Sequence, residues 1–565
     1  MKIIPFKFSI FSALLLSFNF LQAQVSSTDW LQKIGSNTED DAAYAIASDN
    51  DGNFYVTGSV KGSVDIDPGI GAHYITTKQY DGFLSKHDSL GNLIWANTIS
   101  GIMDDAGYSI LVDDESNVYV SGEYHVMVHF DPNETDTTRM GGLVKGDGFL
   151  CKYYSDGSFA WVNTFGDVGV DERHEMAFDH EGNILISGIY SMQTTFGNET
   201  ISPVGEREIF VSKMDTAGNF LWTRTFEGEN SNVKSVALKS DNLGNTYILG
   251  DFTGTIDFDP GASSLSLYAD EVRNVFLVKL DTDGDLSWAH QVGDDAIVLA
   301  NSMVTSNDGN VYVAGVFHGA IDVNPGSWEE ELSSENTDGV FETHVFMFGW
   351  DINGDFIWGN SLDESSGAKI ESLEISEENK IYAMGTFTDR LDFDFYGTEY
   401  IREQSGKNGF ICEWDELGFI NWVRPLVISQ DINIGNIHYD GQDNLLCVGG
   451  FQGTLYAHNE MMVSNTSMDI FMYKMSLSGN LSVEELQPTI SVYPNPTNGG
   501  FTIQLGDYSD KVELRITNIK GQLLQEEIYH DTDEIKVNLH GSPGVYFIEL
   551  MDEKGMVQHL RMVKK

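Results

Sequence analysis

The sequence predicts an all-β protein, because short strand-like segments separated by Gly-, Asn- and Asp-rich turns fill the chain and no segment has helical periodicity. Two hairpin patterns each recur in seven units along residues 30–483, and a different set of alternating segments begins at residue 490. We therefore expect a seven-bladed β-propeller of four-stranded blades over residues 24–483, followed by a small β-sandwich over residues 490–565. A polar linker at 484–489 would join them.

The N-terminus has the pattern of a signal peptide. Lys2 and Lys7 supply its positive charge, an apolar run from Phe8 to Leu21 follows, and Ala23 is a small residue at the cleavage point. A membrane anchor is the alternative, but the apolar run is shorter than the roughly 20 residues that a spanning helix needs. We expect residues 1–23 to be removed and the mature chain to have no transmembrane segment.

The more visible of the two patterns is a hairpin whose second strand carries a tryptophan. These tryptophans are 61 to 70 residues apart from Trp30 onward, and the others are Trp95, Trp161, Trp222, Trp288, Trp358 and Trp422. Trp30 has no hairpin before it, and the seventh hairpin has Val483 at the tryptophan position. The segment Trp30–Ile34 is therefore expected to be the missing fourth strand of the last unit.

The other pattern is a hairpin that precedes the first pattern in every unit, as in DNDGNFYVTG at residue 49 and SNDGNVYVAG at residue 306. Each unit then holds four strands, which in the fourth unit we place near residues 234–240, 246–252, 275–281 and 286–292. Pairing of Trp30–Ile34 with the last unit closes a ring and removes exposed sheet edges. A pair of smaller propellers or an array of sandwiches is the alternative.

The units resemble the bacterial seven-bladed β-propeller repeat family of large exported surface proteins. The resemblance rests on the DG-F-L-x-K, YVTG and GNxxW elements and covers nearly all of residues 30–483. It implies a fold rather than a function, since one fold serves many functions.

The C-terminal segment carries motifs of its own: YPNPTNGGF at residue 493, NIKGQLL at 518, LHGSPGVYFIEL at 539 and a basic end at Lys564-Lys565. It resembles the type A C-terminal sorting domain of the type IX secretion system of the Bacteroidetes. The resemblance implies that residues 490–565 are recognised by the outer-membrane secretion machinery. The protein would then pass the inner membrane by its Sec signal peptide and be secreted or held at the cell surface.

The chain is strongly acidic, with a formal net charge of −54, nearly all of it between residues 24 and 489. This charge disfavours nucleic acid, whose binding depends on neutralising phosphates, and it disfavours anionic membranes. Adaptation to salt is the plainest interpretation, and binding of divalent cations is the other. The three cysteines, Cys151, Cys412 and Cys447, do not form a disulfide framework.

Paired acidic residues recur between the two hairpins of several units, as in VDIDPG at residue 64 and TIDFDPG at residue 255. Residues i and i+2 of a strand face the same side, so each pair presents oxygen atoms of the kind that Ca²⁺ prefers. The candidate calcium ligands are Asp65, Asp67, Asp257, Asp259, Asp322, Asp392 and Asp394. The alternative is turn chemistry, in which each aspartate accepts hydrogen bonds from nearby backbone.

Catalytic motifs are sparse. We find no G-x-S-x-G, H-E-x-x-H or phosphate loop, and DTDGD at residue 281 lacks the glycine position and closing glutamate of an EF-hand. His125 and His129 would lie too far apart along a strand to share a metal easily, and His174 sits in a charged run expected to be a solvated loop. The tryptophans are expected to pack between blades, although quinoprotein dehydrogenases have a similar tryptophan pattern.

We therefore expect an exported, non-enzymatic binding or adhesion scaffold for a polysaccharide or a surface protein, with calcium as its one candidate cofactor. A secreted polysaccharide-active hydrolase or lyase with its site at the propeller channel is the main alternative. Buried carboxylates or histidines with shifted pKa values at the channel would favour the enzyme. A quinone-cofactor oxidoreductase is the third hypothesis.

Overall fold

A computed structural model of the chain describes residues 29–36, 38–69, 71–131, 138–140, 146–165, 175–228, 231–293, 296–326, 329–334, 343–362, 367–395, 401–457, 460–477, 490–493, 497, 499–518, 523–542, 544–552 and 557–564. All the elements in these ranges are strands, so the predicted all-β class is confirmed. The predicted signal peptide, the linker at 484–489, Val483 and His174 lie outside the described residues.

Residues 30–476 contain seven antiparallel groups of four strands, called units and numbered here in chain order. Units 6 and 7 share one eight-stranded sheet, and β10 (Met127–His129) and β11 (Thr138–Met140) extend the sheet of unit 1 to six strands. Unit 1 holds β2 (Ala42–Ser48), β3 (Phe54–Val60), β6 (Asp81–His87) and β7 (Leu93–Gly101). Unit 2 holds β8 (Ala106–Val112), β9 (Val118–Tyr124), β12 (Asp147–Tyr153) and β13 (Phe159–Phe165). Unit 3 holds β14 (Glu175–Phe178), β15 (Ile184–Tyr190), β18 (Glu208–Met214) and β19 (Phe220–Phe226). Unit 4 holds β20 (Asn232–Ser240), β21 (Thr246–Asp257), β22 (Ser266–Leu280) and β23 (Leu286–Val292).

The remaining units follow the same order. Unit 5 holds β24 (Ile297–Thr305), β25 (Val311–His318), β28 (His344–Trp350) and β29 (Phe356–Leu362). Unit 6 holds β30 (Lys369–Ile375), β31 (Ile381–Asp392), β32 (Ile401–Trp414) and β33 (Ile420–Ile428). Unit 7 holds β34 (Asp431–Tyr439), β35 (Asn444–Ala457), β36 (Glu460–Ser476) and, from the other end of the chain, β1 (Trp30–Ile34).

Short hairpins extend four of the units between their second and third main strands. They are β4 (Ser63–Asp65) with β5 (Tyr74–Thr76), β10 (Met127–His129) with β11 (Thr138–Met140), β16 (Thr194–Phe196) with β17 (Glu199–Ile201), and β26 (Ala320–Asp322) with β27 (Glu331–Ser333). In unit 4 the same extension is continuous with β21 and β22, where Asp257 pairs with Ser266. The fourth unit therefore has the four predicted strands, but its middle two are longer because they run on into the acidic turn.

The pairing of β1 with β36 joins the two ends of the repeat region. Trp30 lies opposite Lys474 and Ile34 opposite Ile470 in an antiparallel register. The split unit that the tryptophan spacing predicted is thus completed by Trp30–Ile34.

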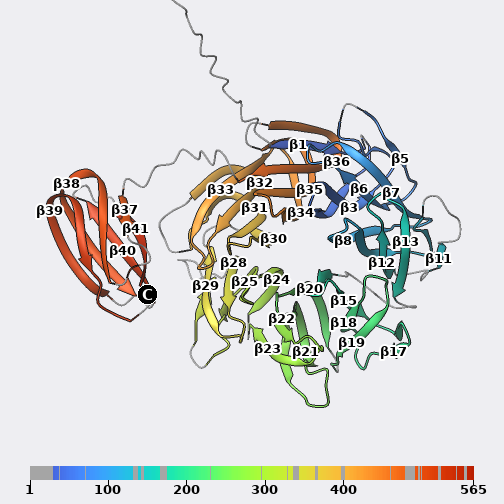
Figure 1. Cartoon of the computed structure of the whole chain (residues 1–565), viewed down its shortest axis with the longest axis horizontal. Coiled ribbons are helices and arrows are strands. Elements are labelled where there is room, and N and C mark those ends of the chain that lie inside the picture. The colour runs from blue at the N-terminus through green and yellow to red at the C-terminus, as the bar shows by residue number, and fades with distance from the viewer. Residues whose placement is uncertain are drawn as a thin grey trace, which may run out of the picture.

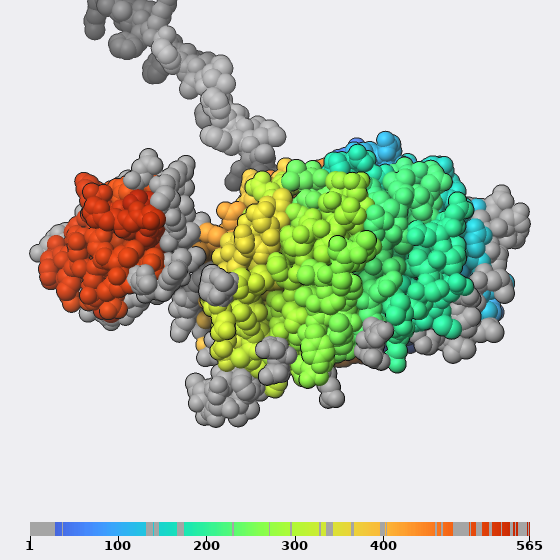
Figure 2. Space-filling view, turned by 90° about the horizontal axis from the view of Figure 1, so that it is seen from below, coloured from blue at the N-terminus to red at the C-terminus, as the bar shows by residue number. Residues whose placement is uncertain are grey.

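The units are arranged around a central space in a propeller-like manner (Figure 1). The first strand of each unit lies innermost and contacts the first strands of its neighbours: β2 contacts β8 and β34, β14 contacts β8 and β20, and β24 contacts β20 and β30, which in turn contacts β34. Seen from the side, the units follow one another in chain order as adjacent bands (Figure 2).

The core lies between neighbouring sheets rather than within one. One apolar cluster joins Phe54 and Val56 of unit 1 to Val448 and Met472 of unit 7, and others join each unit to the next. Burying two apolar faces per sheet is what makes the strand sequences rich in Val, Ile and Phe.

The C-terminal segment forms a separate antiparallel sheet with its own apolar core. Its strands are β37 (Ile490–Tyr493), β38 (Gly500–Asn518), β39 (Leu523–Asn538), β40 (Gly544–Asp552) and β41 (Val557–Lys564). The alternating pattern suggested shorter strands, but β38 runs through the segments expected at 501–505 and 512–518, and β39 through those expected at 522–527 and 535–539, so that one connected sheet results.

Candidate functional site

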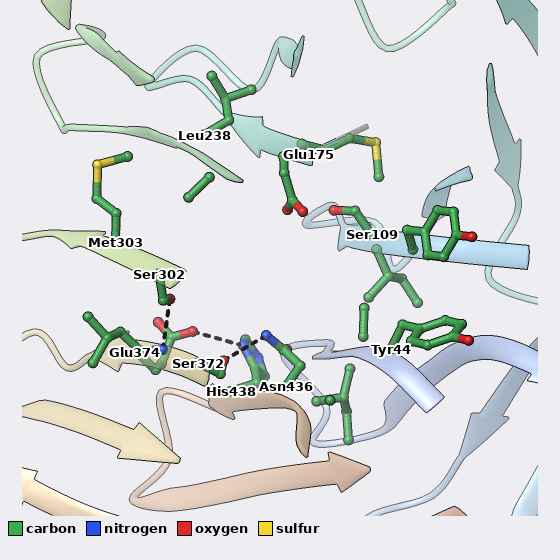
Figure 3. Close-up of a pocket in the computed structure, with 18 of the residues that line it drawn as sticks. Tyr44, Ser109, Glu175, Leu238, Ser302, Met303, Ser372, Glu374, Asn436 and His438 are labelled. Carbon is green, nitrogen blue, oxygen red and sulfur yellow. Dashed lines mark hydrogen bonds and ion pairs between the residues drawn. The ribbon is translucent and has the colours of Figure 1, made fainter. Parts of the chain in front are cut away.

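The first strands of the seven units line a central cavity of about 930 Å³. Side chains from β2, β8, β14, β20, β24, β30 and β34 all contribute to it, so no single unit makes the site. Figure 3 shows Ser372, Glu374, Asn436 and His438 close together on one side of this cavity. We call it the channel.

A β-bulge occurs at the same place in the first strand of six units. The register to the second strand shifts by one residue there, which leaves one residue unpaired; these residues are Tyr44, Tyr108, Val236, Asn301, Glu371 and Gly435. All six line the channel. Bulges bend a strand and re-aim a side chain, so the unpaired positions turn variable side chains toward the channel without disturbing the sheet behind them.

Hydrogen bonds between adjacent first strands hold the channel wall. The hydroxyl of Ser302 accepts a bond from the backbone N–H of Leu373 (2.9 Å). One unit further on, the hydroxyl of Ser372 accepts bonds from the N–H of Ile437 and from the side-chain amide of Asn436, both at 3.2 Å. These serines accept their hydrogen bonds from neighbouring strands, so they join adjacent first strands of the wall.

The channel carries both signs of charge: Lys234, Lys239, Lys369, Glu175, Glu371 and Glu374 all line it. Burial raises the pKa of Glu371 above its ordinary value, and one of its carboxylate oxygens is buried without a hydrogen-bond partner. Burial acts in the same direction on Glu374, but the neighbouring His438 imidazole and the charge of Lys239 outweigh it and hold its pKa below the ordinary value. Two glutamates on one strand therefore differ in acidity.

A serine, a histidine and a glutamate from three different units meet at the channel wall. Ser48 Oγ lies 2.9 Å from His438 Nε2, and His438 Nδ1 lies 3.9 Å from Glu374 Oε2. Ser48 ends β2, His438 lies near the end of β34 and Glu374 near the end of β30. All three are partly exposed to the channel.

A second cavity of about 420 Å³ opens between units 7, 1 and 2 and shares Tyr44, Tyr108 and Glu123 with the channel. Carboxylates dominate it, and burial raises the pKa of Asp105 to about 8 and that of Asp41 to about 6. The negative charges of Asp81, Asp104 and Glu123 add to the shift of Asp105. This recess therefore holds carboxyl groups that take up protons more readily than ordinary aspartates.

The candidate calcium ligands lie in turns at the ends of the hairpin extensions. In each turn the first aspartate accepts the backbone N–H two residues on: Asp65 from Asp67, Asp257 from Asp259, Asp322 from Asn324 and Asp392 from Asp394. Asp67 and Asp259 in turn accept from Gly69 and Gly261. The turns therefore contain the hydrogen bonds of the alternative interpretation, and in the described part of the chain no three His, Cys, Asp or Glu side chains gather as a metal ion would require. Calcium at these positions stays a prediction.

Five of the seven repeated tryptophans are bonded to a turn of the next unit. The indole N–H of Trp95 donates to the carbonyl of Ser155 (3.1 Å), and that of Trp358 donates to Glu416 (2.9 Å), in each case in a turn of the following unit. Trp161, Trp288 and Trp30 make the same kind of bond to Thr216, Ile352 and Ser89. The predicted packing role of these residues is visible in the contacts.

Other residues that the sequence singled out have structural partners. Asp281 of DTDGD accepts the N–H groups of Asp283 and Asp285, as expected of a hairpin turn. His125 lies in the acidic recess, where its Nε2 is 3.4 Å from Glu123, while His129 is on β10. All three cysteines are buried and unbonded to one another.

Sequence reasoning did not identify Ser48, Glu374 or His438. The sequence does contain a pattern that could have identified two of them. When the units are aligned on the turn that follows the first strand, Glu374 and His438 occupy the same position in consecutive units. Four other units carry Ala47, Leu111, Ala177 and Val304 there.

The fold and channel thus define an all-β, propeller-like repeat protein. Its residues 491–565 match the family model of the secretion system C-terminal sorting domain. This domain indicates export by the type IX system to the cell surface or beyond. Among the described residues, no helix has the length and apolar character needed to cross a membrane.

Two curated proteins are similar to part of the chain. One is an uncharacterized WD repeat-containing protein of Acanthamoeba polyphaga mimivirus, 21% identical over 321 residues, which are 49% of this chain and 22% of that protein. The other is the regulatory protein FlaEY of Caulobacter vibrioides, 26% identical over 198 residues, which are 34% of this chain and 20% of that protein. The chain spans about a fifth of the length of these relatives.

Two solved structures are distantly similar to the chain. The extracellular domain of a putative one-component system of B. thetaiotaomicron is 11% identical, with a TM-score of 0.21, covering 93% of this chain and 81% of that one. An apocarotenoid oxygenase of Synechocystis is 8% identical, with a TM-score of 0.36, covering 78% of this chain and 96% of that one.

Proposed function

We propose that this protein is an exported seven-bladed β-propeller that acts as a binding scaffold and holds a polar ligand in its central channel. The propeller would occupy residues 24–483 and the sorting domain residues 490–565, with the signal peptide at 1–23 and the linker at 484–489. The Bacteroidetes origin suggested by the sorting motifs is part of this proposal.

Closure of the ring is supported at the seam between units 7 and 1. Here β1 pairs with β36, β2 contacts β34, and Trp30 bonds to the unit 1 turn as four of the other repeat tryptophans bond to the turns of their following units. A ring leaves no free sheet edge between its first and last units.

The observation that carries the binding role is the composition of the channel wall. All seven first strands contribute to it, and lysines, glutamates, serines and asparagine face one space of about 930 Å³. A ligand that fills such a space needs many hydroxyl or amide groups and little net charge. A polysaccharide segment meets both needs, and a polar surface-protein loop is the other ligand the scaffold would take.

The test is a glycan and polymer binding array with the mature chain from residue 24. We expect binding that Lys369→Ala and Glu371→Gln weaken at least tenfold and that Glu378→Gln, on an exposed turn outside the channel, leaves unchanged. Binding that survives both channel changes would contradict a channel site.

A secreted polysaccharide-active hydrolase or lyase is the second candidate, favoured by the two glutamates of β30. Glu371 has a raised pKa and Glu374 a lowered one, which is how a protein separates an acid from a base at one pH. Release of new sugar ends from a bound polymer, lost in Glu371→Gln, would select this candidate over binding alone.

A further inference from the structure

The seven units provide an internal comparison for the channel residues. In every unit the first strand is followed by a turn whose first residue donates its backbone N–H to the carbonyl of the residue four positions later. The first residues of these turns are Asp49, Asp113, Asp179, Asp241, Ser306, Ser376 and Asp440. Two residues before this turn, four units carry aliphatic residues, so the fold itself needs no polar group there. Units 4, 6 and 7 carry Lys239, Glu374 and His438 instead.

These three departures all line the channel. His438 is close to Glu374, and the charge of Lys239 acts on Glu374 as well. In unit 1 the aligned position is Ala47, and the residue after it on β2, Ser48, is within hydrogen-bond distance of His438. Polar residues that break a repeat and converge across three of its units are expected at a functional site rather than a structural one.

The geometry of the group is ordered. Glu374 lies on the Nδ1 side of His438, where a carboxylate favours the tautomer with its proton on Nδ1. Nε2 is then free to accept the hydroxyl proton of Ser48 at 2.9 Å. A nucleophile bonded to a base that a third group orients is the arrangement of nucleophilic catalysis.

We propose that Ser48, His438 and Glu374 form a hydrolytic site for esters, with Ser48 as nucleophile, His438 as general base and acid, and Glu374 as positioning residue. The substrate class is an ester of a short acyl group with a polar alcohol, such as an acylated sugar. The channel is polar and about 930 Å³ in volume, which suits such an alcohol better than a long apolar chain. This inference rests on the proposed role of the channel as a ligand site.

The reaction balances with water as the only co-reactant. Ser48 Oγ attacks the carbonyl carbon while its proton passes to His438 Nε2, and the C–O bond to the alcohol breaks as His438 returns that proton to the leaving oxygen. Water then attacks the acyl group on Ser48, again losing a proton to His438, which passes it to Ser48 Oγ as the acid is released. The products are one alcohol and one carboxylic acid.

The test measures hydrolysis of p-nitrophenyl acetate and covalent labelling by a fluorophosphonate probe, using the mature full chain. We expect turnover and a single labelled serine, identified as Ser48 by peptide mapping. Ser48→Ala should abolish both, and His438→Ala should lower the rate about 100-fold or more. Label on other residues, or hydrolysis equal in the parent and Ser48→Ala, would overturn the proposal.

Thr305→Val is the matched control. Thr305 occupies in unit 5 the position of Ser48, and its hydroxyl bonds to the carbonyl of Ser240 across the unit boundary (3.1 Å). If Ser48 only joins units, both substitutions should lower the melting temperature alike and neither should affect turnover or labelling. We expect Thr305→Val to keep full activity.

Glu374→Gln tests the positioning role. It should lower kcat about tenfold or more with KM and melting temperature unchanged, and Glu374→Asp should recover part of the loss. A change in KM or melting temperature alone would assign Glu374 a structural part. Glycan binding without labelling of Ser48 would overturn the proposed hydrolytic site and leave the proposed binding scaffold standing. Labelling of Ser48 without glycan binding would support the hydrolytic site and overturn the binding scaffold.

Discussion

The ion pair between Lys33 and Asp469 offers a quantitative test of the seam. Lys33 Nζ lies 2.7 Å from Asp469 Oδ2, and the Asp469 side chain is only 2% exposed, whereas that of Lys33 is 32% exposed. The other oxygen of Asp469 has no hydrogen-bond partner, and its charge also acts on the buried Asp41. Lys33→Met keeps the apolar stem but leaves the buried carboxylate without its counter-charge.

Removing one partner of a buried pair typically costs more than the pair itself contributes, because an uncompensated charge remains. We expect Lys33→Met to lower the free energy of unfolding by about 3 kcal/mol. Adding Asp469→Asn in the same chain should recover most of that loss, since the remaining group is then neutral.

Urea unfolding at pH 7, followed by the fluorescence of the ten tryptophans, measures these values. Lys407→Met is the control, because Lys407 and Asp431 form a pair at 2.9 Å whose side chains are 40% and 50% exposed. It should cost less than about 1 kcal/mol. Equal effects of Lys33→Met and Lys407→Met would refute the reasoning that β1 buries a charge pair in the ring.

Three further predictions concern the recess, the unit contacts and the acidic turns. Burial raises the pKa of Asp105 to about 8, so the carboxyl group keeps its proton in the folded state. The stability that this protonated group contributes is full at low pH and lost as pH rises through 8. Asp105→Asn should therefore be more stable than the parent at pH 9 by a few kcal/mol, and an identical pH dependence of the urea midpoint in the variant and the parent would contradict this. Trp288→Phe should cost about 1 kcal/mol more than Trp222→Phe in the same assay, because the Trp288 indole N–H donates to Ile352 whereas that of Trp222 is buried without a partner. The predicted calcium sites require that EDTA lower the melting temperature at low salt and that Ca²⁺ restore it, with a smaller response in Asp257→Asn, which removes one of the four candidate turns; an unchanged melting temperature would leave the turns to their backbone hydrogen bonds alone.

The strands could be predicted because their signals are local. Turn residues such as those at Asp241 and Asp281 mark hairpins within ten residues of sequence, and the fourth unit has its strands where they were expected. The pairing of Trp30–Ile34 with β36 was also predictable, although more than 400 residues separate the strands, because a repeat with a missing piece specifies where that piece belongs.

The channel could not be predicted in the same way. Ser48 and His438 are 390 residues apart, and their contact depends on which strand of each unit is innermost and on the β-bulges that set the register beyond it. One-residue shifts at Tyr44 and Glu371 move every later side chain of the strand to the other face. No local sequence pattern predicts such a register shift. The proximity of these residues can therefore be inferred only from the aligned units or seen in the structure.

The position of the three residues has a consequence for how stability and chemistry are connected. Glu374, His438 and Ser48 come from units 6, 7 and 1, so the proposed site crosses the seam that β1 completes. Units 6 and 7 are further joined by strand pairing between β33 and β35, whereas units 7 and 1 meet through apolar contacts, side-chain bonds and isolated backbone contacts such as the bond from the Asp41 N–H to Met468. Loosening the seam should therefore separate Ser48 from His438 before it separates His438 from Glu374. In Lys33→Met, hydrolysis and labelling of Ser48 should decline at urea concentrations below those that unfold the chain, while in Lys407→Met the two should be lost together.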